Sequence, residues 1–200
     1  CLSQSNLYYT NGGLYLPVWL IKTGAVHIYK DMCSTGVYLT GKNISKEKAD
    51  IEVKAYIQNT QNTPANVVLK HTVTGPDDKQ CAVFEAKAEI AAEATQAVTA
   101  QAAISNPQLW EIKKGNLYTV KTDVVVDGKI TDTLTERTGF RTVKMENGCF
   151  MVNGKELLAR GVCKHQQGEH QWNAMTDKDL LEEMNGMIDL GCNAIRLAHY

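Results

Sequence analysis

Cysteine and histidine side chains crowd into one short stretch of this sequence, Arg160-Gly-Val-Cys-Lys-His-Gln-Gln-Gly-Glu-His170. Two chemistries use such residues: a metal centre, or a nucleophilic Cys163/His165 pair. The spacing favours neither. His165 and His170 lie five positions apart in an expected loop, whereas the helical zinc motif H-E-x-x-H needs an i, i+4 pair and a glutamate where this chain has Gln166. Strand side chains two apart point to one side but rarely face each other, which disfavours the nucleophile pair.

A strand–helix–strand pattern surrounds this stretch. The apolar run 157–165 predicts a strand buried on both faces. Thr176 followed by Asp179 is a helix N-cap signature and Gly191 a helix stop, with leucine, methionine and isoleucine at helical spacing between them. The run 192–200 predicts a second buried strand. We therefore expect a βαβ unit that opens a parallel sheet.

Catalytic groups in parallel α/β folds lie where the strands end. The first strand ends near His165 and the second near Arg196 and His199, so we expect these three side chains to converge. Arg160, within the first strand, would point inward beneath them. The alternatives are histidines that merely satisfy polar groups at strand ends, and a buried ion pair for Arg196. Because two strands and one helix cannot close a barrel, we also expect the chain to be part of a longer protein.

The preceding residues, 24–142, show period-two patterns between turn signals. In 51–59, Ile51, Val53, Ala55 and Ile57 occupy one face. Asp127-Gly128 predicts a hairpin with a type I′ turn, and we assign the alanine-rich stretch 86–103 to strands. About seven short strands without a helical pattern predict an antiparallel, immunoglobulin-like β-sandwich. Asn153-Gly154 predicts another hairpin, and residues 12–23 a single strand.

Composition sets the broad class. The chain is 44% hydrophobic and 22% charged, with a net charge of −1, which is typical of a globular protein and disfavours nucleic-acid or anionic-membrane partners. It contains no apolar run of about 20 residues, and its first residues do not resemble a signal peptide. The six cysteines include no C-x-x-C pair, so we expect buried small apolar residues rather than disulfides.

Several segments together resemble glycoside hydrolase family 2, the β-galactosidases, β-glucuronidases and β-mannosidases. They are "GGLYLPVWL", "GFRTV", "FMVNGKELLARGVCKHQ" and "NAIRLAHY", the last resembling the β-galactosidase branch. The resemblance implies a mainly β chain: 1–23 as the end of an N-terminal jelly-roll sugar-binding domain, 24–142 as the immunoglobulin-like β-sandwich, and 143–200 as the incomplete start of a catalytic TIM barrel, its first βαβ unit.

The same resemblance implies roles for individual residues. His165 and His199 would bind sugar hydroxyls, Arg196 would arrange the surroundings of the nucleophile, and Arg160 matches the arginine of the family's R-G-V. The implied reaction is retaining exo-β-glycoside hydrolysis, with a β-galactoside as the favoured substrate. Two glutamates beyond position 200 would catalyse it. No catalytic residue is expected within this chain, which should be inactive alone. Glu169, Glu182 and Glu183 lie in a loop or on the outer helix and are no substitutes.

The chain also departs from the family pattern, and this leaves the exact sugar open. The departures are Leu16 for arginine, Cys163 for asparagine, Lys164 for arginine, Gln166 for glutamate and Ala198 for serine. No metal or cofactor is expected within the chain, although the full-length parent could hold Mg²⁺ through later residues. The expected parent is a bacterial protein that can be homo-oligomeric and needs neither nucleic acid nor membrane. Its compartment is left open between cytoplasm and periplasm, and the periplasm is slightly favoured.

Two other functions would need only the β-sandwich. One is a non-catalytic carbohydrate-binding or adhesion module, and the other is an interaction domain of a two-component or surface protein. Residues 155–200 discriminate between these functions and the enzyme, because a binding module has no need of a βαβ unit with histidines at both strand ends.

Overall fold

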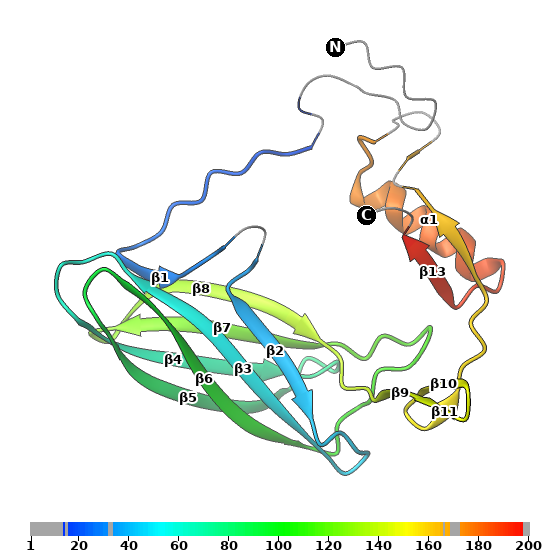
Figure 1. Ribbon diagram of the computed structural model, residues 1–200, viewed down its shortest axis with the longest axis horizontal. Helices are drawn as coiled ribbons and strands as arrows, with labels where there is room; N and C mark the ends of the chain where they lie inside the picture. The colour runs from blue at the N-terminus through cyan, green and yellow to red at the C-terminus, as the bar shows by residue number, and fades with distance from the viewer. Residues whose placement is uncertain (1–13, 15, 32–33, 166, 169–172, 198–200) are drawn as a thin grey trace. The chain divides into compact units, whose positions relative to one another are not determined.

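The computed structural model describes residues 14, 16–31, 34–165, 167–168 and 173–197. They form two compact units, one covering Lys22–Leu158 and the other Ala159–Tyr200 with Cys1–Ile21, as far as these are described. Figure 1 shows a β-sandwich in the first unit and a helix with two strands in the second. The described chain is mainly β, as predicted.

Two antiparallel sheets make up the sandwich (Figure 1). In the first sheet, the central β3 pairs with β6 along one edge and with β1 and β2 along the other. The second sheet has the order β5-β4-β7-β8. The bounds are β1 (Val26–Ile28), β2 (Val37–Lys42), β3 (Lys48–Asn59), β4 (Ala65–Thr74), β5 (Gln80–Ile90), β6 (Ala94–Ser105), β7 (Tyr118–Val126) and β8 (Lys129–Thr138).

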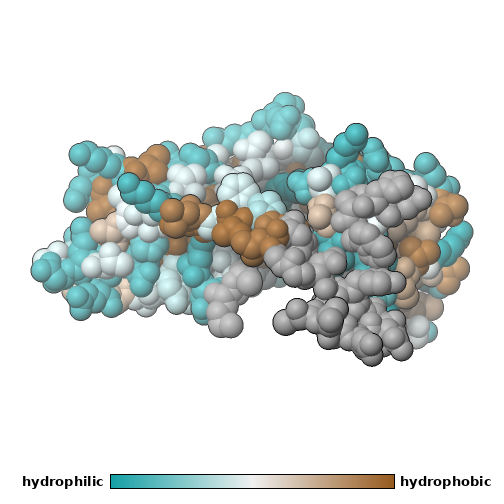
Figure 2. Space-filling view, turned by 90° about the horizontal axis from the view of Figure 1, so that it is seen from above, coloured by the Kyte–Doolittle hydropathy of each residue, from teal (hydrophilic) through white to brown (hydrophobic). Residues whose placement is uncertain are grey.

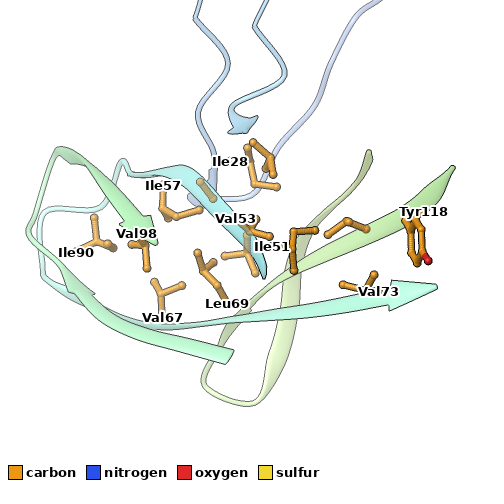
Figure 3. Packing of buried hydrophobic residues seen from close by; sticks show 14 of the residues in the cluster. Ile28, Ile51, Val53, Ile57, Val67, Leu69, Val73, Ile90, Val98 and Tyr118 are labelled. Carbon is orange, nitrogen blue, oxygen red and sulfur yellow. The ribbon is translucent and has the colours of Figure 1, made fainter. Parts of the chain in front are cut away.

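The core arises from the alternation of apolar residues along the strands. Ile51, Val53 and Ile57 of β3 are fully buried, as predicted, and they belong to one cluster with Val67 and Leu69 of β4. Figure 3 shows these side chains between the strands. Burying each such side chain stabilises the fold by about 1.5–3 kcal/mol. The alanine-rich stretch lies in β5 and β6, which confirms its assignment to strands and the immunoglobulin-like sandwich.

Short turns link the hairpins. Asp127 and Gly128, with φ of 49° and 75°, join β7 to β8 as the predicted positive-φ pair. The predicted hairpin at Asn153-Gly154 joins β10 (Cys149–Val152) to β11 (Lys155–Glu156). A turn that we did not predict, at Asn147-Gly148, joins β9 (Val143–Glu146) to β10. The three strands form a small sheet within the first unit.

The strand predicted within residues 12–23 is wrong for the part that the structure describes. Residues 14 and 16–24 form no strand, and Trp19 and Leu20 are 81% and 99% exposed. Pro17 has no N–H to donate to a ladder. No described strand pairs with this segment, so its backbone gains no ladder bonds and its apolar side chains gain no burial.

The cysteines also differ from expectation. Cys81 and Cys163 are exposed, while Cys149 and Cys192 are half-buried, and all four are free thiols. The burial predicted for them is therefore wrong. Cys81 lies on β5, which is hydrogen-bonded on one side only among the described strands. The other two cysteines lie outside the described residues.

Polar side chains cover the outer faces of the sandwich. Lys42 pairs with Glu52 at 2.6 Å, and Gln101 donates to the same carboxylate at 2.5 Å. On the face seen in Figure 2, hydrophilic residues predominate and hydrophobic ones form small groups. No described helix is long and apolar enough to cross a membrane.

The second unit contains the predicted βαβ arrangement. β12 (Gly161–Lys164) and β13 (Ala194–Leu197) pair in parallel, and α1 (Asp177–Asp189) connects them. Thr176 and Asp179 form the predicted capping box, and Gly191, with φ of 84°, follows the helix end. Burial of the strands on both faces is wrong, however, since three of the four β12 residues are exposed. Within this unit, each of the two strands has only the other strand and α1 beside it, and these cover only part of its surface.

Candidate functional site

The register of β12 and β13 decides which side chains share a face. Cys163 is the direct partner of Arg196, whose Nη1 lies 3.9 Å from the Cys163 Sγ. Lys164, the next residue, forms an ion pair with Glu183 of α1. Because side chains alternate along a strand, α1 covers the Lys164 face. Cys163 and Arg196 therefore lie on the face turned away from the helix.

Gly161 brings the two strands together at the start of β12. A Cβ atom at this position would lie 2.3 Å from the Ala194 carbonyl oxygen, so only glycine fits here without a shift. The neighbouring Arg160 lies just before β12 rather than within it. Its carbonyl accepts from the backbone N–H of Asn193 at 2.8 Å, and its own N–H donates to Asn193 Oδ1 at 2.7 Å. The backbone of Arg160 thus helps to hold β13 in place, while its side chain is exposed.

His165 directly follows β12 and is exposed. Its carbonyl accepts two hydrogen bonds, from Lys164 Nζ at 3.0 Å and from the Gln167 N–H at 2.9 Å. Arg196 lies within β13 and is also exposed in the described chain. The alternative, a buried ion pair that supports the barrel, needs further barrel strands and stays open. His199 lies outside the described residues, and its convergence with His165 stays a prediction.

The metal and cofactor expectations stay open as well. His170 lies outside the described residues. Among the residues that are described, no three or more His, Cys, Asp or Glu side chains come together as a metal site would require. Whether a longer parent holds Mg²⁺ stays a prediction.

Sequence reasoning missed the ion pair between Lys164 and Glu183. Lys164 entered only as a departure from the family pattern, and Glu183 only as a residue on the outer helix. The available signal was a lysine at the end of an otherwise apolar strand, since such an ammonium needs a buried partner. The choice among the acidic residues of α1 required coordinates.

Comparisons with known proteins agree with this geometry. Residues 34–141 match the model for glycosyl hydrolases family 2, and residues 143–200 match the model for the TIM barrel domain of the same family. The chain is 27% identical to a β-galactosidase of Bacteroides ovatus over 193 residues, covering 96% of this chain and 22% of the relative. It is 30% identical to a β-glucuronidase of Bacteroides fragilis over 201 residues, covering 94% and 27% respectively.

A solved structure supports the fold. Bacteroides uniformis β-glucuronidase 2, covalently bound to cyclophellitol-6-carboxylate aziridine, superposes with a TM-score of 0.82 at 26% identity. The match covers 89% of this chain and 22% of that one. The chain thus spans about a quarter of the length of these relatives. The compact units divide at Leu158 and the family models between 141 and 143, so the predicted domain limits stay predictions. With one family model covering more than half of its residues and the barrel model following directly, the chain belongs to glycosyl hydrolase family 2, and it carries the family's immunoglobulin-like domain and the start of its TIM barrel.

Proposed function

We propose that this chain is part of a retaining exo-β-glycosidase. The observation that carries the proposal is the position of His165 and Arg196 on the β12–β13 pair, in a segment that matches the family's barrel domain. In such barrels, the strand face opposite the helices is the interior, and the ends of the strands form the active site. His165 follows the end of β12, and Arg196 lies on the face turned away from α1.

Each of these residues has a role that suits its chemistry. His165 and His199 hydrogen-bond sugar hydroxyls, and this interaction strengthens as the transition state develops. The guanidinium of Arg196 presents paired donors that match a carboxylate, so it orients the nucleophile. Arg160 supports the same subsite through its hold on β13.

The bond-breaking groups are two carboxylates about 5–5.5 Å apart, one acting as acid/base and one as nucleophile. Neither helix glutamate is suited to these roles, because Glu183 pairs with Lys164, and Glu182 is exposed and lies 3.8 Å from Lys178. We therefore assign both roles to glutamates on later barrel strands of the parent.

We favour a β-galactoside as the substrate, on the basis of "NAIRLAHY" and the similarity to a β-galactosidase. A β-glucuronide is the second candidate, because several relatives and solved structures are β-glucuronidases. The test is the kcat/KM of the full-length protein on matched aryl β-galactoside, β-glucuronide and β-mannoside. We expect the galactoside to be cleaved fastest, and preference for the glucuronide would select the second candidate.

Stereochemistry and binding test the reaction class. NMR of the reaction mixture should show the β-anomer of the released sugar first, as retention requires. Initial release of the α-anomer would contradict the mechanism. A full-length protein that binds glycans but hydrolyses none of the panel would favour the non-catalytic carbohydrate-binding module.

A further inference from the structure

We propose that Lys164 is a positioning residue that fixes the backbone of His165 against α1. This inference rests on the proposed function, because it concerns the residue assigned to sugar binding. The Lys164 side chain is only 8% exposed and forms an ion pair with Glu183. Its Nζ also donates to the carbonyl of His165 at 3.0 Å. One ammonium group thus joins the helix to the residue that follows the strand.

The chemistry of lysine suits this bridge. An ammonium carries three donors and no acceptor, so it can serve a carboxylate and a carbonyl together. Withdrawing two charges from water costs free energy that the ion pair only partly offsets, and well-packed apolar residues are often as stable. Stability alone therefore gives little reason for this pair. The effect that an apolar pair could not reproduce is geometric, because the ion-paired Lys164 determines where the His165 carbonyl lies.

A second donor supports the same position. The Gln167 N–H donates to the His165 carbonyl at 2.9 Å, on the loop side of the residue. The carbonyl therefore accepts from the Lys164 ammonium, which is paired with α1, and from the Gln167 N–H in the loop. With its backbone held in this way, the imidazole at the end of β12 is preorganised before the sugar binds. A misplacement of about 1 Å in such a group can cost about a hundredfold in rate.

The decisive variant in the full-length protein is Lys164→Leu/Glu183→Leu. It replaces the ion pair by an apolar pair, which keeps the packing and should keep the melting temperature close to that of the unsubstituted protein. The donor to His165 is lost, so kcat/KM on the preferred aryl glycoside should fall roughly tenfold to a hundredfold. Lys164→Arg retains both charge and donors and should keep most of the activity.

The neighbouring glutamate provides a matched control. Glu182→Gln removes an exposed charge one residue away, whose pairing with Lys178 spans 3.8 Å at the surface, and should leave kcat/KM unchanged. If the double leucine variant does not fold, Lys164→Gln serves instead, because its shorter neutral side chain cannot reach the carbonyl and leaves no ammonium buried. Because the Glu183 Oε2 that pairs with Lys164 is buried, this substitution is combined with Glu183→Gln, which leaves no buried charge without a partner.

Amide hydrogen exchange provides a readout that does not depend on activity. Loss of the Lys164 donor should speed the exchange of the Gln167 amide, whereas Glu182→Gln should not. Unchanged exchange and unchanged kcat/KM in a folded Lys164 variant would overturn the inference. If exchange speeds up but His165→Ala leaves kcat/KM intact, the positioning by Lys164 stands and the proposed role of His165 in sugar binding fails.

Discussion

Cys163 and Arg196 are direct partners in the parallel pair of β12 and β13, with 3.9 Å between the Cys163 Sγ and the Arg196 Nη1. Both side chains are exposed in the described chain, on the face opposite the ion pair between Lys164 and Glu183. In the proposed barrel this face is the interior, so the guanidinium would be available to the active site.

Replacing Arg196 by alanine should therefore separate activity from stability. In the full-length protein we expect kcat/KM to fall roughly tenfold to a hundredfold, the effect of losing a charge-assisted hydrogen bond. The loss of free energy of unfolding should stay below the roughly 3–5 kcal/mol that breaking a buried ion pair costs. Arg137→Ala, at an exposed arginine of β8, is the matched control. Equal kinetics for the two variants would argue against the role of Arg196.

Gly161→Ala tests the close approach of the two strands. The new methyl group would meet the Ala194 carbonyl at 2.3 Å, so β13 must move, at a cost of about 1–3 kcal/mol. Because β13 carries Arg196, kcat/KM should fall as well. Gly186→Ala is the control, since no atom lies within 4 Å of its Cβ position in α1, and it should stabilise the helix by about 0.5–1 kcal/mol. Chemical denaturation and kinetics of the two variants provide the comparison.

His71 makes the stability of the β-sandwich depend on pH. Its side chain is fully buried in β4, its Nδ1 lies 3.0 Å from Thr122 Oγ1, and its ring centroid is 5.0 Å from that of Phe84. Burial lowers the pKa of His71 from 6.5 to about 4. Because burial disfavours the charged ring, the contribution of neutral His71 to the free energy of unfolding is fully present above pH 6.5. This contribution is lost as the pH falls toward 4. The loss amounts to about 3 kcal/mol.

Denaturation midpoints between pH 4 and pH 7 would measure this loss. His71→Leu should remove most of the dependence on pH. His27→Gln, at a half-buried histidine of β1, should keep it. The same slope in the protein and in His71→Leu would show that other groups control the acid response.

Much of the fold followed from local rules. The alternation along β3, the turn at Asp127-Gly128 and the capping box at Thr176 each require only neighbouring residues, and each is present. The exposure of β12 could not be predicted from such local rules. An apolar run indicates what a strand can bury, while the neighbours in space decide what it does bury.

The candidate site was predictable only in part. Strand order and parallel pairing placed Arg196 and His165 in one βαβ unit, and the structure adds the register that pairs Arg196 with Cys163. The link from Lys164 to Glu183 crosses from a strand to a helix, and no periodicity marks it. The burial of His71 likewise could not be predicted, because a polar residue at an inward position of a strand resembles an interruption of the apolar alternation.

The chain of residues 1–200 should show no glycosidase activity by itself, because the two carboxylates that the reaction needs are assigned to later strands. The assay is the release of an aryl leaving group from a β-galactoside by the purified chain, beside an equal concentration of the full-length protein. Turnover that follows the chain through successive purification steps would show that residues within it suffice for catalysis.

A crystal structure of the full-length protein, with its glycosyl-enzyme intermediate trapped by a fluorinated galactoside, would show directly whether His165 and Arg196 face the bound sugar. We expect a sugar at the ends of β12 and β13, with a ring nitrogen of His165 within hydrogen-bond distance of a hydroxyl and Arg196 beside the carboxylate that carries the sugar. A sugar attached at a site that neither residue approaches would contradict it.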